Sequence, residues 1–185
     1  GQETIINQLH ERDIHCVGMY PFSAAIKNWV AYSGLDTGKA GADALIKKGC
    51  RRLAIISGPT EYPELGNPLK GFVHALNHAG LVAEQGRIRT IPFTEQEGMR
   101  CFQELWTKHG DFDGLIVTDE LIFRGVVKGI HACGIKVPQQ LKVATQMSTN
   151  DKPLFFPVVK LLTPPAQEAA CIVEMFEQLI NDNTV

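Results

Sequence analysis

Short apolar runs alternate with longer amphipathic segments along almost the whole chain. The apolar runs at 52–57 and 114–118 are continuous, which is typical of strands buried on both faces of a parallel sheet. Further strands are predicted at 14–20, 29–33, 87–91, 142–146 and 158–162, and apolar residues at helical spacing predict helices at 3–12, 38–48, 69–79, 95–109, 121–133 and 166–180. Gly49, Gly80 and Gly134 follow three of these helices and are typical helix ends.

This alternation of strand and helix predicts an α/β fold of parallel sheets flanked by helices. A helix between two parallel strands forms a right-handed crossover, and repeated crossovers cover both faces of the sheet. Such sheets bind ligands at the carboxyl ends of their strands. The candidate ligand contacts are therefore the residues at or directly after predicted strand ends: Tyr20, Ser33, Gly58, Phe93, Thr118, Asp119, Glu120 and the segment 146–148.

Composition narrows the choice of partners. The 185 residues suffice for one domain or two small lobes with a substantial core, and 44% apolar and 21% charged residues are ordinary for a soluble globular protein. A net charge of −2 gives no general attraction to nucleic acid. Any DNA-binding function is therefore expected on a segment outside this sequence.

The cysteines and the apolar runs point to a cellular compartment. Cys16, Cys50, Cys101, Cys133 and Cys171 are odd in number and widely spaced, and no two form a Cys-x-x-Cys pair. This usage predicts free, mostly buried thiols in a reducing compartment. No apolar run approaches the ~20 residues that span a bilayer, and the polar, amphipathic start differs from a signal peptide. We therefore expect a cytoplasmic protein without a membrane partner.

Residues 34–40 (GLDTGKA) come close to a phosphate-binding P-loop. That motif needs four residues between its glycines and a Ser or Thr after the lysine to hold Mg²⁺. Here three residues separate Gly34 from Gly38, and Ala40 follows Lys39. A strand–turn–helix connection is the better interpretation of this segment, with nucleotide phosphate binding as the alternative.

Other candidate chemistry is sparse. His74 and His78 stand four residues apart on a predicted helix, a spacing that can bring two imidazoles to one metal. No glutamate lies between them, however, and no third ligand is near in sequence, so a solvated helix face is the better interpretation. The sequence also has neither a Gly-x-Ser-x-Gly motif nor a Cys–His nucleophile signature. We therefore expect no metal, no cofactor and no catalytic residue.

Two groups of charged residues have both a structural and a functional interpretation. Lys47, Lys48, Arg51 and Arg52 surround the end of a predicted helix, where cations complement the helix dipole; a partner-binding role is the alternative. Asp119 and Glu120 follow a buried strand and open the next helix, where carboxylates cap the N-terminus. The same two acids also have the chemistry to accept ligand hydroxyls or to act as acid and base. Since the sequence offers no second catalytic partner, capping combined with ligand contact is favoured.

Several strings of residues are similar to those of the LacI/GalR transcriptional regulators. They are 42–49 followed by 51–59, 69–72 with 75–76 and 79–80, Gly98, 114–119 followed by Gly125, 134–143, and Pro157 ahead of 163–165. Their order and spacing match the family from about residue 3 to residue 182. The chain therefore resembles the effector-binding domain of these regulators.

This resemblance implies a type I periplasmic-binding-protein-like fold, in which crossover strands join two lobes and the effector binds in the cleft between them. Residues 34–163 would form the C-terminal lobe with the crossover strands, and residues 1–33 and 164–185 would form part of the N-terminal lobe. The first part of the N-terminal lobe and the DNA-binding headpiece of the family would be missing from this chain.

Carried over residue by residue, the resemblance also implies a ligand site. Phe93 would match the aromatic residue that stacks on a sugar face, and Tyr32 would match a second aromatic residue of the cleft. Thr118 and Asp119 would match the family's Asn-Asp pair, with Glu120 directly after them.

Three further site positions depart from the family. Pro68 stands where the family has an arginine, and Met147 and Tyr20 each stand where it has an acid. A site that binds sugar hydroxyls needs such polar anchors. A flatter or more apolar effector than the usual hexose or pentose, or a degenerate sensor, is therefore an alternative to an ordinary sugar site.

The resemblance implies a sensor that makes and breaks no bond. A small-molecule effector, a sugar or a related metabolite, would close the cleft of a homodimer and change how headpieces outside this chain bind operator DNA. Two alternatives from other classes are a solute-binding protein of a transporter, which a signal peptide at the native N-terminus would reveal, and an α/β enzyme using Asp119 and Glu120, which a turnover assay would reveal.

Overall fold

The computed structural model describes residues 2–19, 24–59, 66–148 and 154–182, which belong to two compact units. Unit 1 comprises residues 1–32 and 163–185, and unit 2 comprises residues 33–162. The sequence analysis predicts the lobe boundaries after residues 33 and 163, each one residue later than the boundaries of these units. That the units are the two lobes of a ligand cleft stays a prediction.

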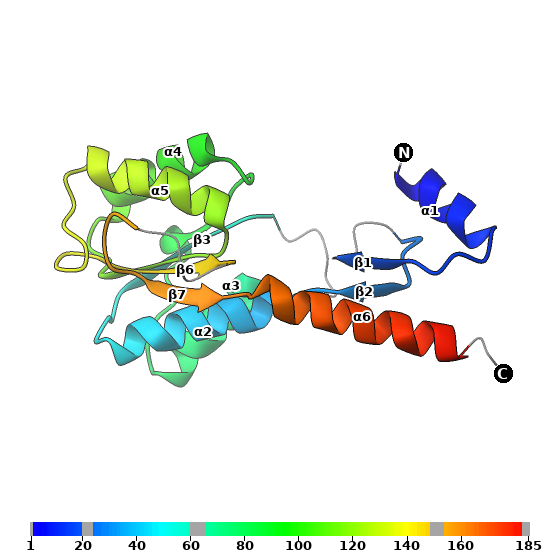
Figure 1. The fold of residues 1–185 in the computed structure, drawn as a ribbon. Helices are drawn as coiled ribbons and strands as arrows, with labels where there is room; N and C mark the ends of the chain where they lie inside the picture. Colours follow the sequence, from blue (N-terminus) through cyan, green and yellow to red (C-terminus); the bar gives the residue numbers. More distant parts are fainter. Residues whose placement is uncertain (1, 20–23, 60–65, 149–153, 183–185) are drawn as a thin grey trace. The chain divides into compact units, whose positions relative to one another are not determined.

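The centre of unit 2 is a parallel sheet of five strands in the order β4-β3-β5-β6-β7. β3 (Leu53–Ser57) and β5 (Gly114–Val117) lie in the middle, between β4 (Ile88–Thr90) on one side and β6 (Lys142–Met147) with β7 (Val159–Leu162) on the other (Figure 1). Every residue of β3 and β5 is buried, as their continuous apolar sequences predict. The predicted α/β architecture with a parallel sheet is confirmed.

Two helices cover each face of this sheet (Figure 1). α2 (Gly34–Lys47) and α3 (Pro68–His78) contribute to an apolar cluster with Leu53, Ile55 and Ile116 of the sheet. α4 (Glu95–His109) and α5 (Glu120–Ala132) contribute to a second cluster with Ala54, Ile56, Leu115 and Val117. Successive strand residues thus point to opposite helix layers, as the pleat of a strand requires.

Helix α2 begins four residues earlier than the sequence predicts, because Ser33 caps it. The Ser33 Oγ accepts a hydrogen bond from the backbone N–H of Asp36 at 3.2 Å, which satisfies one of the unpaired donors at the helix start. Residues 34–40 are therefore the first turns of the helix, and the predicted strand–turn–helix connection at this segment is wrong. A helix in place of a glycine-rich loop also removes the phosphate cradle of the alternative interpretation.

The glycines of this segment allow a close helix crossing. Gly38 and Gly71 are buried where α2 passes α3. A Cβ atom at Gly38 would lie 1.9 Å from the carbonyl oxygen of Pro68, and one at Gly71 would lie 1.9 Å from that of Leu35. The two helix backbones approach so closely that neither position has room for a side chain.

Unit 1 is smaller and has less sheet. Its elements are α1 (Gln2–His10), β1 (Val17–Met19), β2 (Asn28–Val30) and α6 (Pro165–Asp182). β1 and β2 pair in parallel, with Gly18 opposite Trp29. Both strands are shorter than the runs 14–20 and 29–33 predict, since within the described residues each has only one neighbouring strand to extend its hydrogen bonding.

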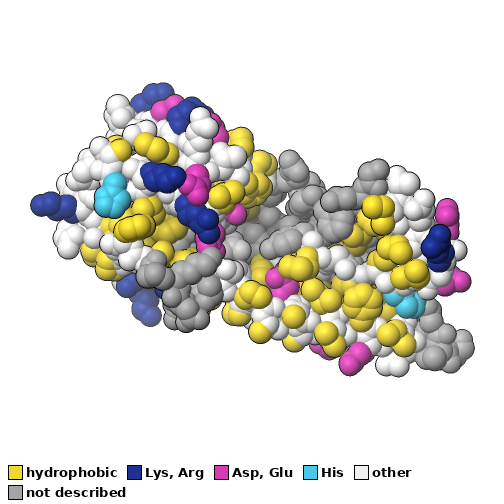
Figure 2. All heavy atoms as spheres, turned by 45° about the horizontal axis from the view of Figure 1, so that its top comes forward, with side chains coloured by type: hydrophobic (Ala, Val, Ile, Leu, Met, Phe, Trp, Pro, Cys, Tyr) yellow, Lys and Arg dark blue, Asp and Glu magenta, His cyan; other side chains and the backbone are white. Residues whose placement is uncertain are grey.

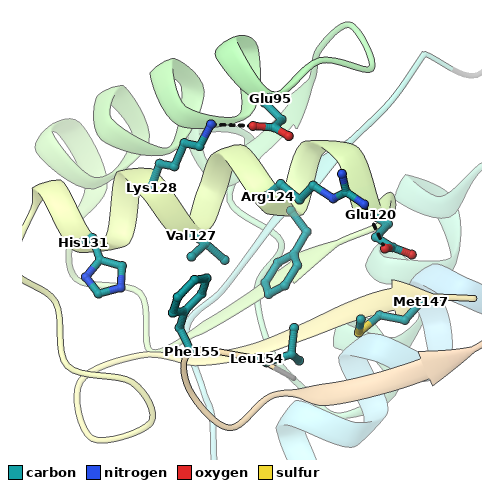
Figure 3. Close-up of a pocket in the computed structure, with 10 residues that line it drawn as sticks. Glu95, Glu120, Arg124, Val127, Lys128, His131, Met147, Leu154 and Phe155 are labelled. Carbon is teal, nitrogen blue, oxygen red and sulfur yellow. Dashed lines mark hydrogen bonds and ion pairs between the residues drawn. The ribbon is translucent and has the colours of Figure 1, made fainter. Parts of the chain in front are cut away.

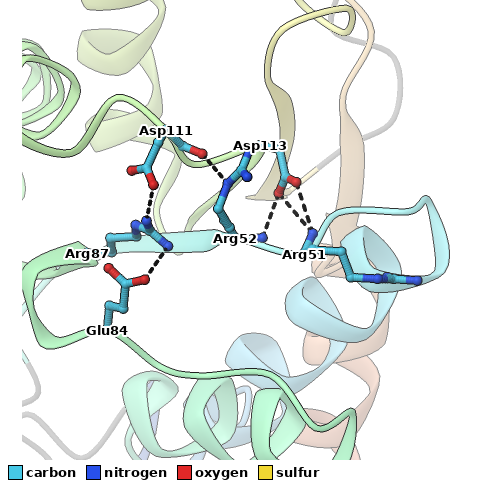
Figure 4. Close-up of polar contacts among 6 residues, drawn as sticks. All are labelled: Arg51, Arg52, Glu84, Arg87, Asp111 and Asp113. Atoms are coloured by element: carbon cyan, nitrogen blue, oxygen red, sulfur yellow. Dashed lines mark hydrogen bonds and ion pairs between the residues drawn. The ribbon is translucent and has the colours of Figure 1, made fainter.

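Charged residues join the amino ends of β3, β4 and β5 (Figure 4). Arg87 is only 4% exposed, and its guanidinium forms ion pairs with Glu84 at 3.0 Å and with Asp111 at 2.7 Å. The Asp111 carboxylate is desolvated, which raises its pKa, but the hydrogen bond and charge of Arg87 outweigh this, and the pKa is lowered overall. The two ion pairs compensate a charge that would otherwise be costly to bury, although among the described residues the Arg87 Nε has no hydrogen-bond partner.

The predicted role of the basic residues at the helix end is confirmed for Arg51. Its guanidinium donates to the carbonyl oxygen of Ile46, near the C-terminus of α2, at 3.3 Å. Just before β5, the Asp113 carboxylate accepts the backbone N–H groups of Arg51 at 3.0 and 3.1 Å and of Arg52 at 2.9 Å. This carboxylate therefore ties the entry of β3 to the entry of its neighbour β5.

The cysteines are free, as predicted, but most of them are not buried. Only Cys50 and Cys101 are buried, whereas Cys16 and Cys133 are half-buried and Cys171 is exposed. Burial raises the pKa of the Cys101 thiol to about 11, so this thiol stays protonated at neutral pH. Within the described residues, no helix has both the length and the apolar character needed to cross a bilayer.

Gly71→Ala is expected to lower the free energy of unfolding by about 2 kcal/mol, because its methyl group has only backbone to displace at the α2–α3 crossing. Chemical denaturation measures this change. The matched control is Ala40→Ser on the exposed side of α2, which should stay within about 0.5 kcal/mol of the native chain. Equal stability of the two variants would contradict the close crossing.

Candidate functional site

Two hydroxyl groups meet at the carboxyl ends of the central strands of unit 2. Thr118, directly after β5, donates from Oγ1 to Oγ of Ser57, the last residue of β3, at 3.0 Å. Ser57 in turn donates to the carbonyl oxygen of Gly58 at 3.1 Å. Since Ser57 is buried and Thr118 is half-buried, this chain of hydrogen bonds holds the Thr118 oxygen in place, where its lone pairs can accept from a ligand.

An aromatic ring lies beside this hydroxyl pair. A Cβ atom at Gly58 would lie 1.9 Å from Cε1 of Phe93, so the Phe93 ring occupies the space that a side chain at position 58 would fill. Phe93 is nevertheless 50% exposed. Gly58 thus seats an aromatic ring that still offers a face to solvent, which is the arrangement that sugar stacking requires.

Asp119 caps helix α5, as predicted. Its Oδ1 accepts the backbone N–H groups of Leu121 at 2.8 Å and Ile122 at 2.9 Å. Among the described residues its Oδ2 has no hydrogen-bond partner, so the carboxylate has the capacity to cap the helix and to accept one ligand hydroxyl at the same time.

Pro68 is a structural residue rather than an anchor. It is the first residue of α3, where a proline ring suits the helix start, and Asn67 caps this helix by accepting the N–H of Leu69 at 2.8 Å. Pro68 is buried, and its carbonyl faces Gly38 of α2. No polar group of its side chain is available to a ligand.

Glu120 and Met147 belong to a different place on unit 2. Both line a pocket of about 610 Å³ together with Glu95, Phe123, Arg124, Val127, Lys128, His131, Leu154 and Phe155 (Figure 3). Met147 is buried, and Glu120 accepts from the Ser148 hydroxyl at 3.3 Å. Ser57, Phe93 and Thr118 do not line this pocket, so the predicted site residues fall into two groups.

The charged residues around this pocket are paired. The Lys128 ammonium contacts the Glu95 carboxylate at 2.5 Å, and the Arg124 guanidinium lies 3.5 Å from the Glu120 carboxylate (Figure 3). The Lys128 hydrogen bond lowers the pKa of Glu95 despite some desolvation. The floor between the pairs is apolar, and Phe155 at its rim is 84% exposed.

Of the two remaining predicted residues, the structure describes Tyr32, which belongs to unit 1. The Tyr32 hydroxyl donates to the carbonyl oxygen of Pro164 at 2.8 Å. Desolvation, followed by the charge of Glu168, raises the pKa of this phenol, so it is a neutral donor at physiological pH. Tyr20 lies outside the described residues.

Sequence reasoning missed Ser57 and the pocket beneath α5. Ser57 ends a continuous apolar strand, and a polar residue at that place was a readable signal. The pocket was harder to find, because Leu154 and Phe155 follow β6 by several residues and only the tertiary fold brings them to α5. Among the described residues no cluster of three metal-ligating side chains occurs, and His74 and His78 are both exposed.

Comparison with protein families matches residues 42–184 to the periplasmic binding protein-like domain. The HTH-type transcriptional regulator MalR of Streptococcus pneumoniae is 31% identical over 152 residues, which are 80% of this chain and 44% of MalR. Catabolite control protein A of Priestia megaterium is 28% identical over 160 residues, 82% of this chain and 47% of that protein. The chain thus spans less than half the length of these relatives, which are regulators rather than enzymes.

Solved structures agree on the fold. A transcription regulator from Lactobacillus plantarum superposes with a TM-score of 0.80 at 18% identity, over 97% of this chain and 68% of that one. A transcriptional regulator CelR–cellobiose complex gives a TM-score of 0.76 at 22% identity, over 96% of this chain and 55% of that one. The predicted periplasmic-binding-protein-like fold is confirmed.

Asp119→Ala is expected to lower the free energy of unfolding by about 1 kcal/mol, because the N–H groups of Leu121 and Ile122 lose their acceptor. Asp119→Asn should retain most of the stability, since an amide oxygen caps a helix about as well as a carboxylate. Thermal and urea unfolding of both variants measure the difference. If alanine and asparagine destabilise the chain equally, the capping role of the Oδ1 atom is wrong.

Proposed function

Because the chain belongs to the periplasmic-binding-protein-like effector domains of the LacI-family regulators, we propose that it binds a neutral carbohydrate at the carboxyl ends of β3, β4 and β5. The observation that carries this proposal is the Phe93 ring seated on Gly58 beside the Ser57–Thr118 hydroxyl pair. An aromatic face next to fixed hydroxyl groups binds the apolar face and the edge of a sugar ring at once.

The polar groups at this site favour an uncharged ligand. Thr118 supplies an acceptor, Asp119 supplies its Oδ2, and Pro68 contributes no cation where the family has an arginine. A carboxylate or phosphate ligand would find no counter-charge among these residues and would face the Asp119 carboxylate. Sugar hydroxyls, which donate to both oxygens, fit the site. The solved CelR complex contains cellobiose, a neutral sugar, which supports this ligand class.

The proposed role is a change of conformational population. A ligand that binds one state of the protein better than another shifts the equilibrium by the difference in its affinities. In the whole regulator this shift would alter the affinity for operator DNA, through a DNA-binding segment outside this chain and in the cytoplasm. The relatives described above are transcriptional regulators, which supports this role over transport of a solute.

We also propose that the partner of this chain is a second copy, bound through the face of α5. Glu120, Arg124, Lys128 and His131 follow one another along this helix, acidic at its N-terminus and basic toward its C-terminus. Two such helices packed antiparallel would set acid against base at both ends. Val127, Leu154 and Phe155 line the same pocket as these charges, and Figure 2 shows hydrophobic side chains among charged ones on this unit. The 84% exposed Phe155 would be covered by the second copy.

Addition of the matching neutral mono- or disaccharide is expected to raise the melting temperature of the chain, because a ligand that binds only the folded state stabilises it by mass action. Thr118→Val should lower the affinity for that saccharide roughly tenfold, because one hydroxyl is lost. Phe93→Ala should lower the affinity by at least as much, because the stacking ring is lost. Thr107→Val, which removes an exposed hydroxyl on α4, is the matched control. The proposal is wrong if only charged metabolites stabilise the chain, or if Thr118→Val binds as well as the control.

Phe155→Glu is expected to convert a dimer to a monomer, because it places a charge in the apolar centre of the proposed interface. Sedimentation equilibrium over a range of protein concentrations measures the dissociation constant. Val82→Glu, at a residue 76% exposed outside this face, should leave the dimer intact. A monomeric native chain, or equal effects of the two substitutions, would rule the interface out without affecting the carbohydrate proposal.

A further inference from the structure

A small groove lies at the amino ends of β6 and β7, the ends opposite to the proposed carbohydrate site. It has a volume of about 280 Å³ and is lined by Lys48, Pro138, Lys142, Val143, Pro157, Val158 and Val159. Lys142 and Val159 are the first residues of β6 and β7, and Lys48 is the C-cap of α2. The walls of the groove are thus set by a helix end and two strand starts, which are among the rigid parts of the unit.

The two lysines of the groove have no counter-ion within the part of the chain that the structure describes. Among the described residues, neither the Lys48 nor the Lys142 ammonium forms a hydrogen bond or an ion pair, whereas Lys39, Arg87, Arg100 and Lys128 of the same unit are paired with acids. None of the lining residues is acidic. The rest of the lining is proline and valine, so the groove combines two free positive charges with an apolar wall.

One carboxylate lies near this end of the unit. Asp113 neighbours Lys142, whose backbone N–H donates to the Asp113 carbonyl oxygen. The Asp113 carboxylate accepts the backbone N–H groups of Arg51 and Arg52. Burial and then the charge of Asp113 raise the pKa of the Cys50 thiol, and the charges of Lys142 and Arg51 oppose that rise. Arg51 is a further cation at this end of the unit, and its backbone N–H group binds the Asp113 carboxylate (Figure 4).

A helix-end role accounts for only part of this arrangement. Lys48 and Arg51 stand at the C-terminus of α2, where cations complement the helix dipole. Lys142 starts a strand, and its half-buried side chain faces the same groove without serving a helix. Holding two like charges at one small groove costs electrostatic energy, which an anion between them would offset.

We propose that this groove binds a small organic anion, a carboxylate on a compact apolar body. The charge matches the two ammonium groups, and the prolines and valines match the body. The volume lies below that of pockets for drug-sized ligands, which are roughly 300–1,000 Å³, so the ligand is limited to a single ring or a short chain.

This groove is separate from the carbohydrate site proposed above. Lys142 pairs with Gly114 at the start of β5, whereas Thr118 follows the end of β5, about 13 Å further along at the usual rise of a strand. The two places share no lining residue, and they differ in charge preference. A ligand that prefers one should not compete with a ligand of the other.

The test uses benzoate as the probe and follows the backbone amide resonances of the isotope-labelled chain by NMR. Benzoate is expected to shift the amides of Lys142, Val143 and Val159 in a saturable manner. Acetate has the charge without the ring and benzyl alcohol has the ring without the charge, so at equal concentration both should produce much smaller shifts. Added salt should weaken benzoate binding, because the attraction is between charges.

Variants locate the site and separate it from chance binding. Lys142→Gln and Lys48→Gln should each weaken benzoate roughly tenfold, as expected for the loss of one charge-assisted contact. Lys108→Gln, at an exposed lysine near the end of α4, is the matched control and should not change the affinity. Unchanged far-ultraviolet circular dichroism checks that each variant is folded. The proposal is overturned if acetate shifts the same amides as strongly, if Lys142→Gln binds like Lys108→Gln, or if the shifts map to Phe93 and Thr118 instead.

Discussion

The burial of β3 and β5 on both faces is the constraint on which the rest of unit 2 depends. Side chains of these strands point alternately to two sides, and each side must be kept from water. Two pairs of helices do this, and each pair has to fit within the width of a short sheet. Glycines make the fit possible, at Gly38 and Gly71 between α2 and α3, and at Gly125, where a Cβ atom would lie 1.9 Å from the carbonyl oxygen of Glu95.

Because all five strands run in the same direction, the sheet separates two kinds of chemistry. At the carboxyl ends the polar groups are hydroxyls and one capping carboxylate, with Phe93 beside them. At the amino ends the groups are charged, and Arg87 and Asp113 connect the strand entries through ion pairs and backbone hydrogen bonds. The neutral ligand proposed at one end and the anion proposed at the other match this polarity.

The helix α5 serves three purposes with different faces. Its buried face carries Phe123 and Val126 into the core, and its N-terminus is held by Asp119 at the carboxyl end of β5. Its outer face carries charged residues around an apolar pocket that is closed on one side by Leu154 and Phe155. The same element therefore carries both the cap at the strand-end site and the proposed partner surface.

The sequence by itself determined the order of the elements, the parallel sheet, its two most buried strands and the cap at Asp119, because each follows from local periodicity or from the needs of a helix end. It was misleading for residues 34–40, where glycines that indicate a turn serve instead to bring two helices together. That contact involves α3, thirty residues further along, so no local pattern reveals it. Likewise, only the tertiary structure decided that Glu120 and Met147 line the pocket with Phe155 and do not belong to the site at the strand ends. It also decided that Lys48 and Lys142 line one groove. These are contacts between distant segments, and their geometry depends on packing rather than on the order of residues.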